Sequence, residues 1–157
     1  AALKDGIADI AFVTTPTERS ATLTETPIRP IDEVAICPPA FSELTGKQVP
    51  LAQVVRRPLI SLGPDTKSFS FYSELFAGCG LPFAPDIEAF TADQILPMVE
   101  ADLGVGFVPR EFLREGDNVC VIDLKEKIPE RSIVMIKRKD QPLSMAARKL
   151  EEMAVAE

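Results

Sequence analysis

The sequence of 157 residues contains no histidine. Histidine is the usual general base of hydrolytic triads and a common zinc ligand, so its absence argues against both kinds of site. The three cysteines, Cys37, Cys79 and Cys120, form an odd set without a CxxC spacing, which argues against a disulfide framework as well. Each has apolar neighbours, so we expect buried free thiols in a reducing compartment, by default the cytoplasm.

The chain has no excess of basic residues. It carries 17 Lys and Arg against 24 Asp and Glu, a net charge of −7, and so offers no basic face to a nucleic-acid backbone. Any contact with DNA is therefore expected from a part of the protein outside this chain. The apolar runs, such as 7–13 and 104–109, are far shorter than a bilayer span, and no export signal is recognisable. We expect a soluble protein.

Catalytic motifs are missing too. The segment "GPDTKS" (63–68) lacks the spacing of a nucleotide-binding loop, and no cysteine has an activating neighbour. Glu88, Asp93 and Glu100 are candidates for an acid pair, but charged residues on helix surfaces are usually solvated. We predict no catalytic residue, no metal and no cofactor, and hence a protein that is not an enzyme.

What the sequence does contain is an alternation of strand and helix patterns. Strands are predicted at 7–13, 31–39, 58–63, 86–90, 104–109, 118–124 and 132–138, and helices at 51–57, 68–80, 92–102, near 110–115 and after Ser144. Alternating strands and helices predict an α/β fold with largely parallel sheets.

The stretch "VEADLGVGFVP" (99–109) ends a helix abruptly and starts a buried strand. We expect Gly104 and Gly106 to allow close backbone packing, an architectural role, because a lone GxG after a helix is a weak phosphate signal. Pro97 fits the preceding helix only if it falls in the first turn.

Two segments resemble crossings between lobes: "TPIRPIDE" (26–33) and "LKEKIPERS" (124–132). They predict two lobes, one of residues 1–30 and 125–157 and the other of residues 31–124, with a ligand cleft between them.

Several stretches together resemble one family. They are "LKDGIADIAFV", "PLISLG", "FAGCGLPFAPDIEAFTADQILPMVEADLGVGFVP", "VIDL" and "QPLSMAARKLEEM", which cover nearly the whole chain. In this order they resemble the effector-binding domain of LysR-type transcriptional regulators. The resemblance implies a two-lobed fold like that of type II periplasmic binding proteins, with a central cleft that senses a small metabolite.

The departures from the family pattern also carry information. The family has a strand, helix and strand before "GIADIAFV", and a winged helix-turn-helix before those, whereas this chain starts at Ala1. We therefore expect an N-terminally truncated fold. In "EADLG", Asp102 stands where the family usually has glycine.

The resemblance implies candidate ligand contacts. Two expected helices begin after "GPDTKS" and "FTADQ", and helix starts attract anions through unpaired amides and the helix dipole. The matching positions are Thr66, Lys67, Ser68, Thr91 and Ala92, with Thr14 and Thr15 added from the carboxyl end of the 7–13 strand. The alternative role of the hydroxyls of Thr66, Ser68 and Thr91 is helix capping. The alternative for the two threonines before Pro16 is that they are ordinary turn residues.

The implied function is regulatory. An anionic effector, a carboxylate, shifts the lobes and so controls DNA binding by a domain absent from this chain. A homodimer or tetramer is implied as well, with apolar helix faces such as that of 68–79 available for it. The alternatives are a solute-binding protein of a transporter, and an enzyme on the same scaffold, such as a prephenate-dehydratase-like catalyst.

Overall fold

Residue contacts divide the chain into two units. The computed structural model describes residues 10–16, 23–138 and 145–155. Unit 1 draws its described residues from Ala1–Ile31 and Arg131–Glu157, and unit 2 is Asp32–Glu130. The lobes expected from the sequence, with boundaries after residues 30 and 124, stay a prediction.

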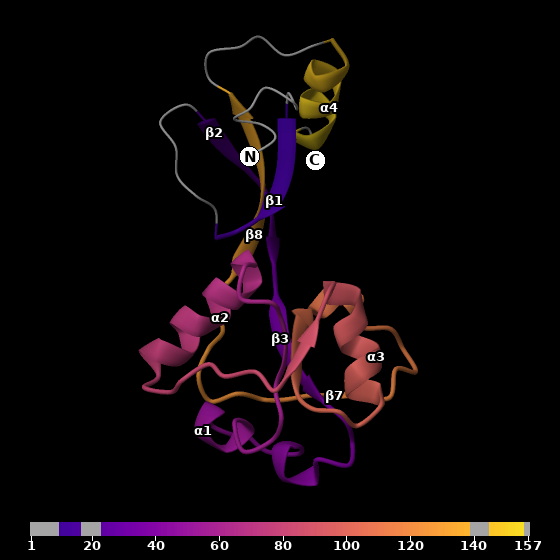
Figure 1. Ribbon diagram of the computed structural model, residues 1–157. Coiled ribbons are helices and arrows are strands. Elements are labelled where there is room, and N and C mark those ends of the chain that lie inside the picture. Colours follow the sequence, from indigo (N-terminus) through magenta and orange to yellow (C-terminus); the bar gives the residue numbers. More distant parts are fainter. Residues whose placement is uncertain (1–9, 17–22, 139–144, 156–157) are drawn as a thin grey trace. The chain divides into compact units, whose positions relative to one another are not determined.

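Unit 1 contains a three-stranded antiparallel sheet in the order β1-β8-β2 and one described helix (Figure 1). Its elements are β1 (Ile10–Thr14), β2 (Leu23–Ile31), β8 (Arg131–Arg138) and α4 (Met145–Val155). The central strand β8 buries Val134, Met135 and Ile136, so both of its faces are covered. Residues 7–9 of the first expected strand and the expected cap Ser144 lie outside the described residues.

Strand β2 includes most of one predicted crossing. In the segment 26–33, residues 26–31 lie in a strand, and the division between the two units, after Ile31, falls within the same segment. Proline lacks the amide hydrogen of the sheet ladder and is tolerated at edges and irregularities. Both conditions hold here, because β2 lies at the edge of the described sheet and its register shifts between Pro27 and Arg29.

Unit 2 is built around β3 (Glu33–Cys37), the middle strand of the sheet β6-β3-β7. The neighbours β6 (Gly106–Pro109) and β7 (Cys120–Val121) both run antiparallel to it. All five residues of β3 are buried. They alternate between two cores, with Ala35 and Cys37 on one side and Val34 and Ile36 on the other. This explains why "VAIC" reads as a continuous apolar run.

The remaining strands of unit 2, β4 (Ile60–Leu62) and β5 (Ile87–Ala89), form a parallel pair. Among the described residues four of the five strand pairs are antiparallel, and the isolated bridges Val49 with Leu124 and Leu59 with Val105 are parallel. The mixed α/β class predicted from the sequence is confirmed, but the expectation of largely parallel sheets is wrong. Alternating elements do not say which strands pair, and here β3 pairs with strands that come much later in the chain.

Helices cover both sides of the β3 sheet (Figure 1). The helices are α1 (Leu51–Val54), α2 (Lys67–Gly78) and α3 (Ile95–Glu100), with 3-10 turns η1 (Ser42–Leu44), η2 (Ala92–Gln94) and η3 (Arg110–Phe112). Tyr72 and Phe76 of α2 are buried in one core, and Ile95 and Val99 of α3 in the other. These two residues of α2 are therefore covered by their own unit, whereas Phe69 and Leu75 of the same face are half-buried. A role of this face in dimerisation stays a prediction.

Several predicted boundaries are shorter in the structure. The helix expected near 110–115 is only the 3-10 turn η3, and the strand expected at 118–124 is the two-residue β7. The helix expected at 92–102 consists of η2 followed by α3, which begins at Ile95. Pro97 therefore falls in the first turn of α3, where its missing amide hydrogen has no intrahelical partner to lose.

The two glycines after α3 have the architectural role expected of them. A Cβ at Gly104 would lie 2.5 Å from the Pro58 carbonyl oxygen, and a Cβ at Gly106 would fall on the Ile95 side chain. Both glycines are buried. The absence of a side chain thus lets β6 approach both the backbone before β4 and the face of α3.

Candidate functional site

The parallel pair β4 and β5 brings two helix starts to one edge. Leu62 is paired with Ala89 at the carboxyl ends of the two strands. After Leu62 the chain enters the turn that precedes α2, and after Ala89 it enters the turn that precedes η2 and α3. We call this region, residues 62–68 and 89–92, the carboxyl edge. It contains five of the predicted ligand residues: Thr66, Lys67, Ser68, Thr91 and Ala92.

Thr66 is the N-cap of α2. Its hydroxyl accepts a hydrogen bond from the Phe69 amide at 3.1 Å and donates one to the Gly63 carbonyl oxygen at 2.8 Å. A capping hydroxyl of this kind holds the first turn and the turn before it in place. One lone pair of the Thr66 oxygen remains for a further donor. The next two residues differ in access, since Lys67 is exposed and Ser68 is half-buried.

The second helix start is held by a side chain from within the helix. The Gln94 Oε1 atom accepts hydrogen bonds from the Phe90 amide at 2.9 Å and the Thr91 amide at 3.4 Å. These two amides are therefore already engaged. Thr91 is exposed and Ala92 is half-buried, so the Thr91 side chain is accessible at the carboxyl edge.

The other two predicted residues, Thr14 and Thr15, belong to unit 1. The Thr15 hydroxyl accepts a hydrogen bond from the Ser132 amide at 2.9 Å, and the Thr15 carbonyl accepts one from Arg131 Nε at 2.6 Å. The premise for selecting these threonines, a parallel strand ending at a ligand site, is wrong, because β1 is antiparallel to β8. Thr15 has a clear structural role in fixing the end of β1 to β8.

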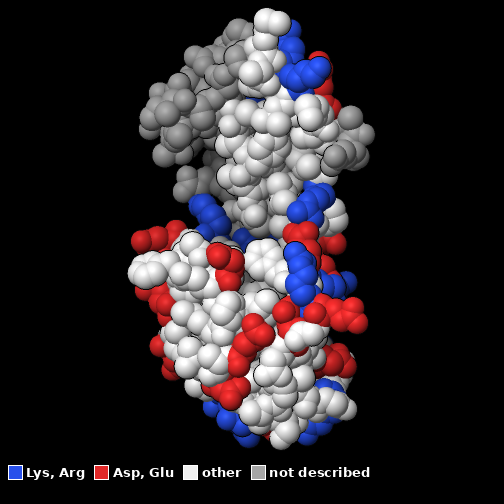
Figure 2. All heavy atoms as spheres, turned by 90° about the vertical axis from the view of Figure 1, so that its right-hand side faces the viewer, with Lys and Arg blue, Asp and Glu red and all other residues white. Residues whose placement is uncertain are grey.

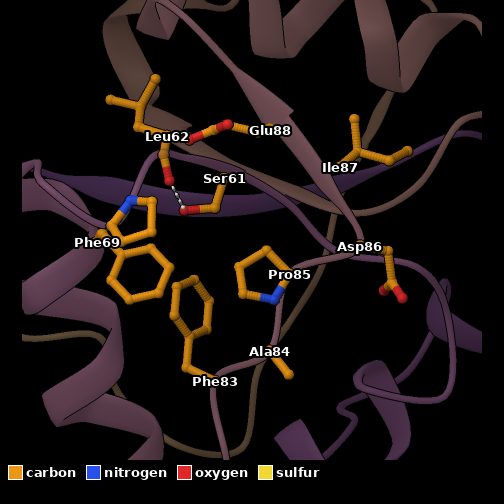
Figure 3. Close-up of a pocket in the computed structure, with 10 residues that line it drawn as sticks. Ser61, Leu62, Phe69, Phe83, Ala84, Pro85, Asp86, Ile87 and Glu88 are labelled. Atoms are coloured by element: carbon orange, nitrogen blue, oxygen red, sulfur yellow. Dashed lines mark hydrogen bonds between the residues drawn. The ribbon is translucent and has the colours of Figure 1, made fainter.

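Beside the carboxyl edge, unit 2 has a hollow of about 380 Å³ (Figure 3). It lies between the start of α2, the strands β4 and β5, and the segment that leads into β5. The residues that line it are Ser61, Leu62, Pro64, Phe69, Phe83, Ala84, Pro85, Asp86, Ile87 and Glu88. None of the seven predicted ligand residues is among them. Its volume lies in the range of roughly 300–1,000 Å³ that is usual for small-molecule sites.

Two exposed residues near the hollow were not among the predicted ligand contacts. Glu88 is exposed, and its carboxylate lies where a Cβ of Gly63 would be. Phe90 has 89% of its surface exposed. The signal for both was the alternation in "DIEAF", which turns Glu88 and Phe90 to the face opposite Ile87 and Ala89.

The acidic balance of the sequence is visible on the surface. Figure 2, in which the α3 side of unit 2 faces the viewer, shows Asp and Glu side chains spread over that face, with smaller groups of Lys and Arg between them. An anionic ligand at the carboxyl edge would therefore depend on local amides, hydroxyls and Lys67 rather than on the field of the whole unit.

The described residues lack two kinds of feature. These residues contain no group of three or more metal-ligating side chains placed to hold an ion. Within the same ranges no helix combines the length and the apolar character needed to cross a membrane.

Comparison with known proteins decides the family. A family model described as the LysR substrate binding domain matches residues 1–157. The chain belongs to this family. A search of curated proteins found no match.

Several solved structures share the fold of this chain. The CcmR regulatory domain of Synechocystis PCC6803, in complex with 2-PG, gives a TM-score of 0.87 at 13% identity, over 99% of this chain and 76% of that one. The effector binding domain of QuiR, in complex with shikimate, gives 0.85 at 16% identity, over 99% and 74%. HinK, a LysR family regulator of Pseudomonas aeruginosa, gives 0.74 at 21% identity, over 99% of this chain and 54% of its own.

These findings confirm the family and the fold expected from the sequence motifs. At identities of 13–21% the structural likeness establishes the fold, while family membership rests on the match over residues 1–157. The chain spans about half the length of HinK, so a whole regulator of that size contains much that this domain does not.

Proposed function

We propose that this LysR substrate binding domain is the ligand-sensing part of a transcriptional regulator and is not a catalyst. The observation that carries the proposal is the family match over residues 1–157. It favours this function over a transporter's solute-binding protein and over an enzyme. The complexes of the CcmR domain with 2-PG and of the QuiR domain with shikimate support small-molecule binding by the same fold.

The effector in this proposal is a small carboxylate held at the carboxyl edge of unit 2. Thr66, Lys67 and Ser68 stand at the start of α2, where the helix dipole favours an anion. Thr91 and Ala92 stand at the second helix start. Lys67 adds a positive charge at the first position of α2. We retain Thr14 and Thr15 of unit 1 as further candidate contacts.

The rest of the proposal concerns the whole regulator. Effector binding is relayed to a DNA-binding domain outside this chain, and the protein acts in the cytoplasm as a homodimer or tetramer. Light scattering of the purified regulator tests the assembly. A gel-shift assay with its operator DNA, with and without effector, tests the relay, because an effector changes DNA affinity only by binding the two states differently.

A thermal-shift screen of aromatic and aliphatic carboxylates tests the site. A ligand present at a concentration of 100 times its Kd raises the free energy of unfolding by about 2.7 kcal/mol, which is readily measured. Replacing a hydroxyl that binds a carboxylate should weaken affinity by roughly tenfold or more. We therefore expect Ser68→Ala and Thr91→Val to reduce the shift produced by the best acid. Ser42→Ala, an exposed hydroxyl in η1, is the matched control.

Three results would count against the proposal. If no carboxylate stabilises the protein, the effector class is wrong. If an acid stabilises it but Ser68→Ala and Thr91→Val bind as well as Ser42→Ala, the assignment of the carboxyl edge is wrong. If the acid binds but DNA affinity stays unchanged, the regulatory role is wrong.

A further inference from the structure

The polar side chains around the hollow in unit 2 are acceptors. Ser61 is 5% exposed, and its hydroxyl donates to the Leu62 carbonyl oxygen at 2.9 Å (Figure 3), which leaves its lone pairs as the free hydrogen-bonding function. Glu88 contributes a carboxylate. Asp86 contributes another, but its Oδ2 atom accepts from the Leu59 amide at 3.1 Å. No Lys or Arg is among the lining residues.

The other walls are aromatic and apolar. The rings of Phe69 and Phe83 lie 5.1 Å apart in an edge-to-face arrangement, and Figure 3 shows Pro85 beside Phe83 and the Asp86 carboxylate turned away from the rings. The far side of Phe83 is supported by Phe76, whose ring centroid is 4.9 Å away. Phe83 is therefore held by the core of unit 2. Aromatic faces attract cations through their quadrupole.

The position of Glu88 depends on its neighbour strand. Its carboxylate lies where the Cβ of any other residue at position 63 would be, at the end of β4. Gly63 thus leaves space for the charge at the mouth of the hollow. A side chain there would displace Glu88 without removing any charge.

We propose that this hollow binds a small cationic hydrogen-bond donor: a primary amine attached to an apolar body. The ammonium group donates to Glu88 and to the buried Ser61 oxygen, and the apolar body packs on Phe69, Phe83 and Pro85. An anion finds two carboxylates and no basic side chain in the lining. The inference concerns the chemistry of the hollow and stands whether or not the domain regulates DNA binding.

A matched set of probes tests the proposal on the protein as it stands. Calorimetric titration compares 2-phenylethylamine, 2-phenylethanol and 3-phenylpropanoate, which share an aromatic body and differ in the end group. We expect the amine to bind with a Kd in the roughly millimolar range or tighter, and about tenfold more tightly than the alcohol. The carboxylate should be weakest. Backbone amide shifts in NMR spectra should locate the amine at Ser61, Phe69 and Glu88.

Variants separate the specific site from general attraction to an acidic protein. Glu88→Gln should weaken amine binding about tenfold, whereas Glu115→Gln, which removes an exposed charge elsewhere in unit 2, should leave it unchanged. Gly63→Ala keeps all charges and should also weaken it, because Glu88 must move. The proposal is overturned if the amine does not saturate, if the alcohol or the acid binds as well, if the NMR shifts lie elsewhere, or if Glu88→Gln and Gly63→Ala both bind the amine unchanged.

Discussion

Gly80 and Asp102 occupy the same position in the turns that end α2 and α3. The amides of Gly80 and Leu81 donate to the carbonyl oxygens of Ala77 and Phe76 at 3.0 and 2.9 Å. Those of Asp102 and Leu103 donate to Val99 and Met98 at 3.0 and 3.2 Å. Both are Schellman motifs, with left-handed φ values of 74° at Gly80 and 64° at Asp102.

The first prediction follows from this pair. A left-handed φ costs an L-residue roughly 1 kcal/mol relative to glycine. The cost is smaller for aspartate than for most other residues. We expect Gly80→Ala to lower the free energy of unfolding by about 1 kcal/mol and Asp102→Gly to raise it by up to about 1 kcal/mol. Urea denaturation measures both. Asp102→Ala should be destabilising, and equal stability of Asp102→Ala and Asp102→Gly would contradict the argument from backbone strain.

The second prediction concerns close packing. Gly106→Ala places a methyl group against Ile95 and 3.1 Å from Val99, and Gly104→Ala places one 2.5 Å from the Pro58 carbonyl oxygen. Overpacking of this kind costs typically about 1–3 kcal/mol. We expect both variants to unfold at a lower temperature, Gly104→Ala more so because its obstacle is backbone.

Gly78 supplies the control for these variants. It is the last residue of α2, and a Cβ there would meet no atom within 4 Å. Gly78→Ala should therefore be neutral or stabilising by up to about 1 kcal/mol, because alanine favours the helix. If all three substitutions had the same effect, close approach would not be the reason for Gly104 and Gly106.

Local patterns predicted many of the described elements, but they missed β2 and overextended β7. The spacing of apolar residues and the glycine at its end located α2 and its Schellman turn, and "GVGFVP" located β6. Pairing was not predictable in the same way. It depends on residues far apart in sequence, such as Ile36 opposite Gly106, and nothing local distinguishes the parallel strand β4 from the antiparallel strand β3.

The site was predictable only in part. Helix starts at Thr66 and Thr91 follow from capping residues, and the parallel pairing of β4 with β5 places both at one edge. The hollow could not be predicted from the sequence, because its shape depends on the path that the segment before β5 takes. Glu88 reads as an ordinary exposed charge until the structure places Gly63 beside it.

A third prediction separates capping from ligand binding at Thr66. Its hydroxyl accepts from the Phe69 amide, so Thr66→Ala should lower the free energy of unfolding by about 1 kcal/mol even without ligand, and Thr66→Ser should restore most of it. Urea denaturation without ligand measures the cap, and titration of each variant with the best carboxylate measures binding. A variant as stable as the wild type would show that the cap contributes little.

The last prediction concerns Cys37, which faces Cys120 across the pair β3 and β7. Burial, followed by the influence of Cys120 and of Glu43, raises the pKa of the Cys37 thiol from 9.0 to about 11, and Arg57 opposes the shift. The folded state therefore holds the proton more tightly than the unfolded state, so stability present below pH 9 is lost between pH 9 and about 11. Near the upper end of this pH range, the free energy of unfolding is lower by about 2 kcal/mol. Urea denaturation against pH should show this decline in the wild type and less of it in Cys37→Ala, which removes the thiol.

At pH 8, iodoacetamide should label Cys37 only after denaturation, and rapid labelling of the folded protein would refute the burial argument.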